Sequence, residues 1–255
     1  AQVRDCLHKI TLSSQHLLGL INDVLDMSKI ESGKLTLNMD LLSLREVTEN
    51  IVNIIQPQVK AKQQSFDIFI QNIQTEQVYC DGVRINQVLL NLLSNALKFT
   101  PEGGCISMTL SQEDSPRGQG YVRTHFYVRD NGIGMSPEFL PHLFDPYYRE
   151  MRFTDRQAVG TGLGMSIVKS LVTQMNGEIS VESRPDEGTT FTVILPFPVI
   201  ETDSEPDAAS APSESFSLEG LRILLAEDNE VNMEISTELL TMHGVQITQA
   251  WDGQE

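Results

Sequence analysis

The sequence has little positive charge, and this absence excludes whole classes of partner. Its 255 residues include 18 Lys and Arg against 35 Asp and Glu, for a net charge of −17. A phosphate backbone is bound chiefly by neutralising Lys and Arg, so this balance argues against a nucleic-acid or anionic-membrane partner. We expect any bound nucleotide to be held locally, together with a cation.

Paired cysteines and long apolar runs are also lacking. Cys6, Cys80 and Cys105 are odd in number and widely separated, and none has the Cys-x-x-Cys spacing of a metal site, so a reducing compartment is expected. The longest apolar stretches are far shorter than the ~20 residues that span a bilayer, and no signal-peptide pattern opens the chain. With 40% hydrophobic residues, the chain is expected to be globular and soluble, with any membrane anchor of the parent protein upstream of Ala1.

The first part of the chain, residues 1–36, predicts one amphipathic helix. Between Leu7 and Ile30 apolar residues recur at steps of three, four and seven, and Gly33 is a natural stop. The apolar face of such a helix needs a second helix to cover it. We therefore interpret this part as half of a helical hairpin.

Residues 38–198 alternate helical and strand patterns and predict an α+β fold, an α/β sandwich with a mixed sheet covered by helices on one face. The expected elements are a helix through Val47, Ile51, Ile55 and Val59, strands near 66–70 and 78–80, a helix at 82–98, strands at 105–110 and 121–129, a helix at 163–176, and strands at 179–182 and 190–195. The glycine-rich loop of about 25 residues between the strand at 121–129 and the helix at 163–176 is long enough to be a functional lid.

The last part of the chain predicts a linker and a partial domain. Between Val199 and Phe216 the sequence E-T-D-S-E-P-D-A-A-S-A-P-S-E-S is acidic, rich in Pro and Ser and almost free of large apolar residues, so residues 199–219 are expected to form a flexible linker. Residues 220–255 predict a buried strand, a helix to about Met242 and a second strand. This order is that of a doubly wound α/β domain, of which the chain would hold an N-terminal fragment.

The helix expected at 82–98 carries a polar stripe. Its members are Arg84, Gln87, Asn91, Asn95 and Lys98, spaced 3, 4, 4 and 3 and therefore on one face. The two Asn side chains could supply carbonyl oxygens to a hard cation, and the Lys ammonium could meet a phosphate, as around Mg-nucleotide. Spacing alone fits a solvated face equally well, so both interpretations stay open.

Two glycine-rich segments flank the long loop. In Asp130-Asn-Gly-Ile-Gly134 a carboxylate at a strand end could accept a hydrogen bond from an exocyclic amine. Gly160-Thr-Gly-Leu-Gly164 precedes a helix, so its N–H groups and the positive helix end could contact phosphate oxygens. Each segment alone also fits an ordinary structural turn, and the second has the spacing of neither a dinucleotide fingerprint nor a Walker P-loop.

Five motifs together carry a resemblance. They are N-L-L-S-N-A-L-K-F-T at 91–100, D-N-G-I-G at 130–134, F-D-P-Y-Y-R at 144–149, G-T-G-L-G-M at 160–165 and G-T-T-F at 188–191. This ordered set resembles the catalytic and ATP-binding domain of sensor histidine kinases, within the superfamily of gyrase, chaperone and mismatch-repair ATPases. The resemblance covers about 38–198, and the segment 16–35 is similar to the second helix of the family's dimerisation and phosphotransfer hairpin.

The resemblance implies a site for ATP and Mg²⁺. Asn95 would be the principal Mg²⁺ ligand with Asn91 beside it, and Lys98 would meet the phosphates. Asp130 would bind the adenine amine, supported by Thr189. The remaining implied ATP-binding residues, mostly the glycines that hinge the two ends of the lid, are Gly132, Gly134, Gly160, Gly162, Leu163 and Gly164.

The lid itself offers further candidates. Arg149, Arg152 and Arg156 would meet the γ-phosphate, although a solvated loop explains them equally well. Phe144 and Tyr147 are expected to be packing residues that set the shape of the lid.

Both phosphate acceptors of the family are missing from the chain. No H-[DE]-x-R-T-P box occurs, and His8 and His16 lack that context, so we interpret them as ordinary helix positions. The segment A-E-D-N-E-V-N at 226–232 resembles the opening of a receiver domain, which implies Glu227 and Asp228 as an incomplete acidic Mg²⁺ pair. The receiver's acceptor Asp is expected beyond the end of the chain.

The resemblance therefore implies a hybrid sensor histidine kinase of a two-component phosphorelay, in the cytoplasmic portion of a membrane-associated bacterial protein. Its γ-phosphate would pass from Mg-ATP to a hairpin His and then to a receiver Asp. The expected partners are ATP, a second copy through the hairpin helices, and a receiver domain in cis or a separate response regulator. The alternative is a catalytically incomplete ATP-binding module that regulates another kinase by hetero-dimerisation. A gyrase- or chaperone-type ATPase is disfavoured by the hairpin helix and the receiver-like tail.

Overall fold

The computed structural model describes residues 2–118, 120–150, 161–199, 220–227, 229–242 and 244–251. The chain forms two compact units, 1–202 and 203–255. Within the described residues, no helix combines the length and apolar character needed to cross a membrane.

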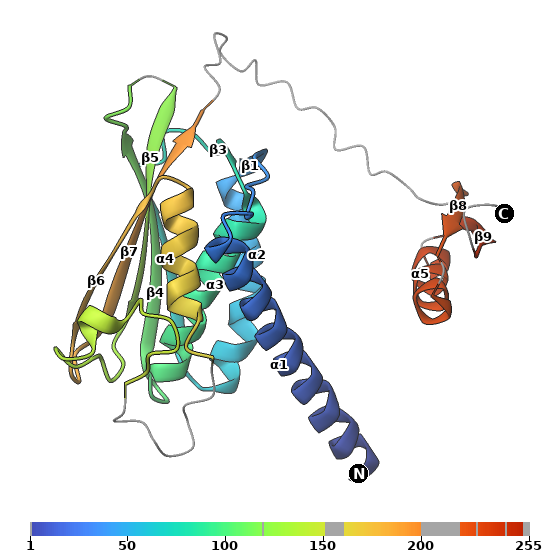
Figure 1. Ribbon diagram of the computed structural model, residues 1–255, viewed down its shortest axis with the longest axis horizontal. Helices are drawn as coiled ribbons and strands as arrows, with labels where there is room; N and C mark the ends of the chain where they lie inside the picture. The colour runs from blue at the N-terminus through green and yellow to red at the C-terminus, as the bar shows by residue number, and fades with distance from the viewer. Residues whose placement is uncertain are drawn as a thin grey trace. The chain divides into compact units, whose positions relative to one another are not determined.

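A five-stranded mixed sheet forms the centre of the first unit, in the order β2-β4-β5-β7-β6 (Figure 1). The strands are β2 (Ser65–Gln71), β4 (Cys105–Asp114), β5 (Tyr121–Asp130), β6 (Glu178–Arg184) and β7 (Gly188–Pro198). β2 runs parallel to β4, and each of the other neighbouring pairs is antiparallel. The predicted mixed sheet is confirmed, although β4 and β7 are longer than the hydrophobic pattern indicated.

Three helices cover one face of this sheet (Figure 1). They are α2 (Leu44–Ala61), α3 (Gly82–Phe99) and α4 (Gly164–Gln174). Along β5, Val122, Phe126 and Val128 are buried, whereas Arg123 and Tyr127, which point to the opposite face, are partly exposed. This alternation is typical of an antiparallel sheet with one face against the core, and it confirms the one-sided arrangement.

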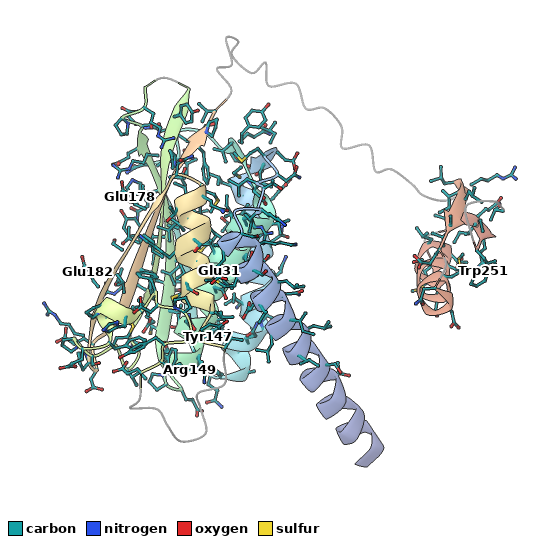
Figure 2. All side chains as sticks on the ribbon, viewed as in Figure 1. Glu31, Tyr147, Arg149, Glu178, Glu182 and Trp251 are labelled. Carbon is teal, nitrogen blue, oxygen red and sulfur yellow. The ribbon has the colours of Figure 1, made fainter. Side chains whose placement is uncertain are left out.

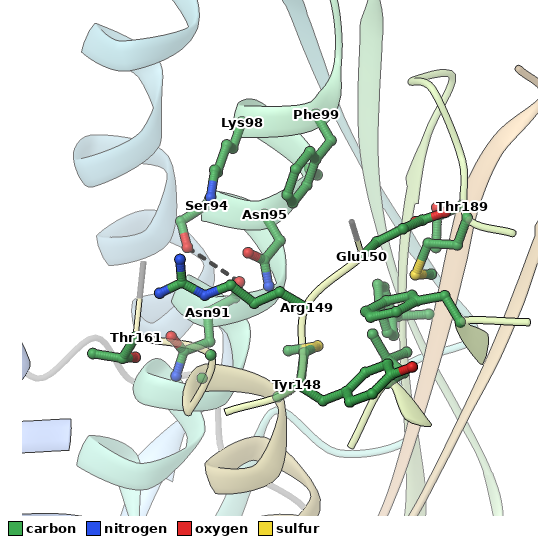
Figure 3. Close-up of a pocket in the computed structure, with 18 of the residues that line it drawn as sticks. Asn91, Ser94, Asn95, Lys98, Phe99, Tyr148, Arg149, Glu150, Thr161 and Thr189 are labelled. Carbon is green, nitrogen blue, oxygen red and sulfur yellow. Dashed lines mark hydrogen bonds between the residues drawn. The ribbon is translucent and has the colours of Figure 1, made fainter. Parts of the chain in front are cut away.

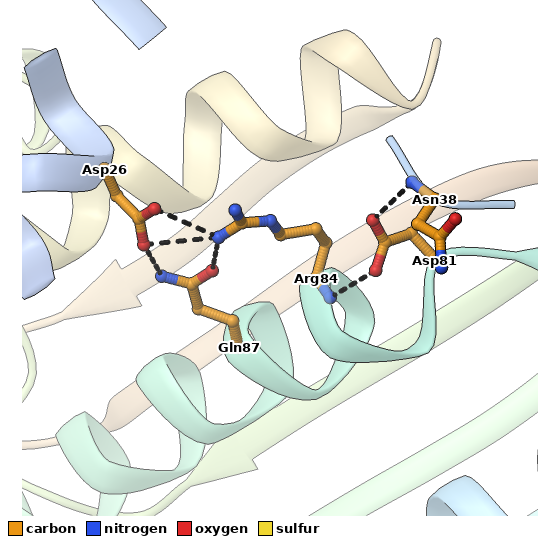
Figure 4. Close-up of polar contacts among 5 residues, drawn as sticks. All are labelled: Asp26, Asn38, Asp81, Arg84 and Gln87. Atoms are coloured by element: carbon orange, nitrogen blue, oxygen red, sulfur yellow. Dashed lines mark hydrogen bonds and ion pairs between the residues drawn. The ribbon is translucent and has the colours of Figure 1, made fainter. Parts of the chain in front are cut away.

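Helix α3 is stabilised both by an N-cap residue and by the burial of its apolar face. The Asp81 carboxylate accepts hydrogen bonds from the backbone N–H groups of Arg84 at 3.0 Å and Asn38 at 2.9 Å (Figure 4). Such a cap contributes about 1 kcal/mol. The buried residues repeat at helical spacing and are Ile85, Val88, Leu89, Leu92, Leu93, Ala96 and Leu97. Their burial turns the apolar side of α3 to the core and leaves its polar stripe on another side.

Helix α1 (Gln2–Glu31) lies along α4 in the first unit (Figure 1). It ends at the predicted stop, where Gly33 has a φ of 64°. Among its described side chains, Met27 and Ile30 pack against the core. A second set of large apolar side chains is about half exposed and consists of Leu17, Leu18, Ile21, Val24 and Leu25.

A polar cluster fastens α1 to α3 (Figure 4). The Arg84 guanidinium lies 3.2 Å from both carboxylate oxygens of Asp26, and the Gln87 amide donates to the same carboxylate at 2.8 Å. The Asp26 and Arg84 side chains are only 14% and 18% exposed. This end of the polar stripe is therefore neither solvated nor free for a ligand, because it binds a neighbouring helix.

Two short elements had no counterpart in the sequence prediction. Strand β1 (Asp40–Ser43) pairs antiparallel with β3 (Gln77–Cys80), and the 3₁₀ helix η1 (Leu140–His142) lies within the expected loop. In β1 the sequence Asp-Leu-Leu-Ser has no alternation, so its extended form could not be read from periodicity.

The second unit is a strand-helix-strand arrangement, as predicted. Strands β8 (Arg222–Ala226) and β9 (Gln246–Ala250) are parallel, and α5 (Glu230–Met242) connects them. Met233, Val245 and Ala250 are buried between these elements.

Candidate functional site

A cavity of about 590 Å³ opens in the first unit between α3, the start of α4, the ends of β5 and β7, and helix α1 (Figure 3). Its volume lies within the range of small-molecule sites. Residues from all five sequence motifs line it. The lining residues that the sequence singled out are Asn91, Asn95, Lys98, Asp130, Gly134, Arg149, Gly162, Gly164 and Thr189.

The wall formed by α3 concentrates polar and positive groups. Asn91, Asn95 and Lys98 point into the cavity, and Arg149 reaches toward them from the opposite side (Figure 3). The pKa of Lys98 is lowered, first by burial and then by the positive charges of Arg149 and Lys62. A cation held where its charge is disfavoured gains from a nearby anion. Asn91, Asn95 and Lys98 therefore line a cavity and do not form a solvated helix face.

Asp130 forms the deep end of the cavity. It is the last residue of β5, is 7% exposed and pairs with Thr189 of β7. Its Oδ1 accepts a hydrogen bond from the Gly132 backbone N–H at 2.8 Å. Burial raises the pKa of Asp130, and hydrogen bonds from the backbone of Gly132 and Thr189 oppose the rise. A buried carboxylate in this state is stabilised by any further donor that a ligand brings.

Ser183, which the sequence analysis missed, organises the residues around Asp130. Its hydroxyl donates to the Gly188 carbonyl at 2.9 Å and accepts from the Met135 N–H at 2.9 Å. The Thr189 Oγ1 lies 2.9 Å from the same oxygen. A hydroxyl has one proton, so Thr189 must donate to Ser183 and can offer only lone pairs to the cavity. No motif contains Ser183, and it could be found only from its contacts.

The two glycines after Asp130 are required by close packing of the backbone. A Cβ on Gly132 would lie 2.5 Å from the Phe99 carbonyl oxygen. Gly134 has a φ of 61°, and a Cβ there would overlap the Arg184 carbonyl. The turn is thereby pressed against the β6–β7 connection, and Gly132 supports Asp130 without lining the cavity itself.

The second glycine segment forms the opposite wall. Gly162 has a φ of 74°, and its carbonyl accepts from the Tyr147 N–H at 3.0 Å, which joins the two ends of the intervening loop. Gly164 opens α4, whose N-terminus has no side-chain cap, and a Cβ there would lie 3.4 Å from the Asn91 Oδ1. The start of α4 therefore faces the cavity with unpaired N–H groups.

Leu163, which the resemblance implied as an ATP-binding residue, is fully buried in the core and is not among the cavity-lining residues; its backbone N–H donates to the Thr161 Oγ1 at 3.1 Å. One expected side-chain role requires correction. The Tyr147 side chain, which is labelled in Figure 2, is 68% exposed, so its expected packing role is wrong, whereas Phe144 does pack against the core. The next residue, Tyr148, lines the cavity instead.

Tyr148 was missed because adjacent aromatic residues are indistinguishable by pattern. Its ring stacks on that of Phe139, with centroids 5.8 Å apart, and lies against His142 at 4.8 Å. These contacts place an aromatic side chain at the cavity wall (Figure 3).

Some of the predicted positions cannot be placed. Gly160, Arg152, Arg156 and Asp228 lie outside the described residues, and His8 and His16 are placed only as backbone positions of α1. Glu227 follows β8 and accepts from the Asn229 N–H at 3.2 Å. In the described parts of the chain, no group of three or more His, Cys, Asp or Glu could hold a metal ion.

Comparison with known proteins gives a family and several relatives. Residues 80–199 match the sequence model of the family described as Histidine kinase-, DNA gyrase B-, and HSP90-like ATPase. The chain is 37% identical over 246 residues to "Autoinducer 2 sensor kinase/phosphatase LuxQ" of Vibrio parahaemolyticus, covering 95% of this chain and 28% of that protein. It is 34% identical over 244 residues to "Sensor histidine kinase GacS" of Pseudomonas protegens, covering 96% and 26%. The chain thus spans little more than a quarter of these relatives.

Solved structures agree in fold. The structure of full-length ShkA in complex with AMPPNP matches all of this chain and 50% of its own, with a TM-score of 0.64 and 26% identity. The Acinetobacter baumannii histidine kinase AdeS matches 74% of this chain and 82% of its own, with a TM-score of 0.57 and 22% identity, and so shares the fold.

Proposed function

We propose that the cavity binds Mg-ATP for a two-component phosphorelay, because residues 80–199 match the Histidine kinase-, DNA gyrase B-, and HSP90-like ATPase family and the chain is similar to sensor histidine kinases. The γ-phosphate passes to a His on a helical hairpin and then to an Asp on a receiver domain. In this reaction the protein acts mainly by positioning and by neutralising charge.

One observation carries the proposal: a single cavity joins a buried carboxylate at one end to amides, cations and an uncapped helix N-terminus at the other. Adenine presents an exocyclic amine, and a triphosphate presents several negative charges. The two ends of the cavity therefore match the two ends of ATP in hydrogen-bonding character and in charge.

At the buried end, Asp130 accepts a hydrogen bond from the adenine amine, and the lone pairs of Thr189 Oγ1 are a second acceptor nearby. Gly132 and Gly134 hold this turn in place by their close packing. The proposal is supported by the raised pKa of Asp130, since a donor from the ligand stabilises its ionised form.

At the other end, Lys98 and Arg149 neutralise the phosphates, and the N–H groups at Gly162 and Gly164 donate to their oxygens. Asn95, with Asn91 beside it, supplies amide oxygens to Mg²⁺. Amide oxygens suit a hard cation, and the phosphates provide the charge that these neutral ligands lack. Held by these amides, Mg²⁺ would offset the negative charge of the phosphates.

The flanking elements fit a hybrid kinase. The half-exposed apolar side chains of α1 suit pairing with further hairpin helices, including those of a second copy. In the second unit, Glu227 follows the carboxyl end of β8, where parallel α/β sheets bind ligands, and with Asp228 it would form the start of a receiver's Mg²⁺ site. From the similarity to bacterial sensor kinases, we further propose that the chain belongs to the cytoplasmic portion of a membrane-associated bacterial protein.

Calorimetric titration of Mg-ADP into wild-type and Asn95→Ala chains tests the site. The wild type is expected to bind, and the variant to bind about 2 kcal/mol more weakly because it loses a metal ligand. With EDTA in place of Mg²⁺, the two chains should bind ADP alike. Asn53→Ala, an exposed Asn-to-Ala change on helix α2, is the matched control and should leave binding unchanged.

The opposite result would be decisive. A folded wild-type chain that binds neither Mg-ADP nor a non-hydrolysable ATP analogue would overturn the proposed nucleotide site.

Phosphoryl transfer gives a separate expectation. Incubated with radiolabelled ATP, the chain alone should acquire no acid-labile phosphate, because no H-[DE]-x-R-T-P box occurs in its 255 residues. A supplied hairpin that carries the acceptor His should become labelled when the chain is added. Acid-labile label on the chain itself would contradict the first statement.

A further inference from the structure

Helix α1 contributes part of the cavity wall, which the proposed reaction does not explain. Gly19, Leu20 and Asp23 all line the cavity alongside Asn91 and the glycine segment before α4. Of these three, only Asp23 carries a charge. A carboxylate in the wall of a site for a polyanion is unfavourable unless the carboxylate has a role there.

Asp23 is bound to the glycine segment itself. The Thr161 hydroxyl donates to the Asp23 Oδ2 at 3.0 Å and accepts from the Leu163 N–H at 3.1 Å. Thr161 and Leu163 flank Gly162, and Gly164 opens α4 directly afterwards. A negative charge therefore already lies at the uncapped N-terminus of α4, where the helix dipole favours an anion.

The surroundings of Asp23 disfavour its negative charge. Burial is the largest influence and raises the pKa of Asp23. The Thr161 hydrogen bond lowers this pKa, and the charge of Asp26, one turn along α1, raises it. Asp26 differs in this respect, because it pairs with Arg84 and Gln87 of α3 and does not line the cavity. The two carboxylates of α1 thus have different surroundings, one facing the cavity and one facing an ion-pair partner.

We propose that Asp23 of α1 is an affinity-determining residue of the cavity, which weakens the binding of nucleotide phosphates by holding negative charge on the Thr161–Gly164 turn. This inference rests on the proposed function, because it requires the phosphates to lie at that turn. It gives α1 a direct effect on the nucleotide in addition to its packing role. The effect depends on phosphate charge and not on adenine.

Asp23→Asn is the discriminating variant. Asn has the same shape and can still accept from Thr161, so it removes the charge and keeps the hydrogen bond. Neutralising a partly exposed charge near a polyanion is expected to tighten Mg-ADP and Mg-AMPPNP binding about fivefold in calorimetry. The gain should shrink at high salt, and adenosine, which has no phosphate, should bind both chains alike.

Asp26→Asn is the matched control on the same helix. It also removes one carboxylate charge and loosens the contact of α1 with α3, but it leaves the cavity wall unchanged. Its phosphate affinity should stay within twofold of the wild type. An equal gain in both variants would assign the effect to helix docking and overturn the role of Asp23.

The remaining outcomes separate the two proposals. If wild type binds Mg-ADP and Asp23→Asn binds it equally well, Asp23 is only a docking contact and the inference fails alone. Weaker binding by the variant would mean that Asp23 helps to hold Mg²⁺, which also overturns it. If the wild-type chain binds neither adenosine nor Mg-ADP, the proposed function fails and the inference falls with it.

Discussion

Replacing Asp130 with Asn should weaken Mg-ADP binding about 30-fold or more, near 2 kcal/mol, and change the free energy of unfolding by less than about 1 kcal/mol. Asn has the size of Asp and can accept the Gly132 N–H through its Oδ1, as Asp130 does at 2.8 Å. Its NH₂ group then replaces the oxygen that would face the adenine amine. Two donors would then oppose each other in a buried site, and the adenine amine would keep only the lone pairs of Thr189 Oγ1 as a nearby acceptor.

The matched control is Asp67→Asn, an exposed strand carboxyl on β2 that does not line the cavity. It should bind Mg-ADP as the wild type does. Calorimetry gives the affinities, and urea unfolding monitors the fold. If Asp130→Asn bound Mg-ADP with wild-type affinity, Asp130 would not contact the base.

The pH dependence of binding follows from the same carboxyl. Burial raises the pKa of Asp130 in the folded protein above its ordinary value of 3.8. The adenine amine donates to the ionised form, so affinity should be complete above the raised pKa and should fall as the pH drops through it. Titrations at a series of pH values would show this loss in the wild type, and a pH-independent affinity would contradict it.

The effect on stability has the opposite sign. Between pH 3.8 and the raised pKa, the folded state binds more protons at Asp130 than the unfolded state does, so this residue's contribution to stability falls as pH rises. Above the raised pKa the contribution is constant. Urea unfolding at a series of pH values measures the difference in free energy of unfolding between the wild type and Asp130→Asn. This difference should change with pH only between 3.8 and the raised pKa.

Replacing Gly134 with Ala should destabilise the first unit by about 3 kcal/mol, the largest effect we expect on the fold. Gly134 has a φ of 61°, which L side chains rarely adopt, and a Cβ there would overlap the backbone of Arg184. A backbone carbonyl cannot move aside as a flexible side chain does. The turn that carries Asp130 would have to separate from the β6–β7 connection, so nucleotide binding should be lost as well.

Gly103→Ala separates the two causes of this loss. Gly103 has a similar φ of 78°, but no atom lies within 4 Å of a Cβ built there. It should therefore cost only about 1 kcal/mol, the conformational part. Urea unfolding of both variants measures the difference, and equal losses would show that packing against Arg184 contributes nothing.

Local sequence patterns were sufficient for much of the fold and for the composition of the site. Val47, Ile51, Ile55 and Val59 repeat at helical spacing and are buried in α2 as predicted. Such periods can be read without the structure because one face of each element must meet the core. The five ordered motifs likewise indicated residues that line the cavity, through their resemblance to the sensor histidine kinase family.

The division of the polar stripe on α3 was decided only by tertiary structure. Arg84 and Gln87 are as polar as Asn91 and Asn95 and lie on the same helix face. The first two bind Asp26, and the last two line the cavity, because α1 crosses that end of α3. Helical spacing determines which residues share a face, but it contains no information on what lies opposite.

The same distinction holds for the rest of the site. From the sequence alone came the amphipathic helices, most of the strands and the glycine turns, which depend on neighbours along the chain, and the candidate nucleotide-binding residues, which the family resemblance implied. Only the tertiary structure decided that Ser183 orients Thr189, that Tyr148 and not Tyr147 faces the cavity, and that Asp23 binds Thr161. These contacts join residues whose partners are selected by packing of the whole unit, since hydrogen bonds and close contacts act across space and leave no local pattern in the chain.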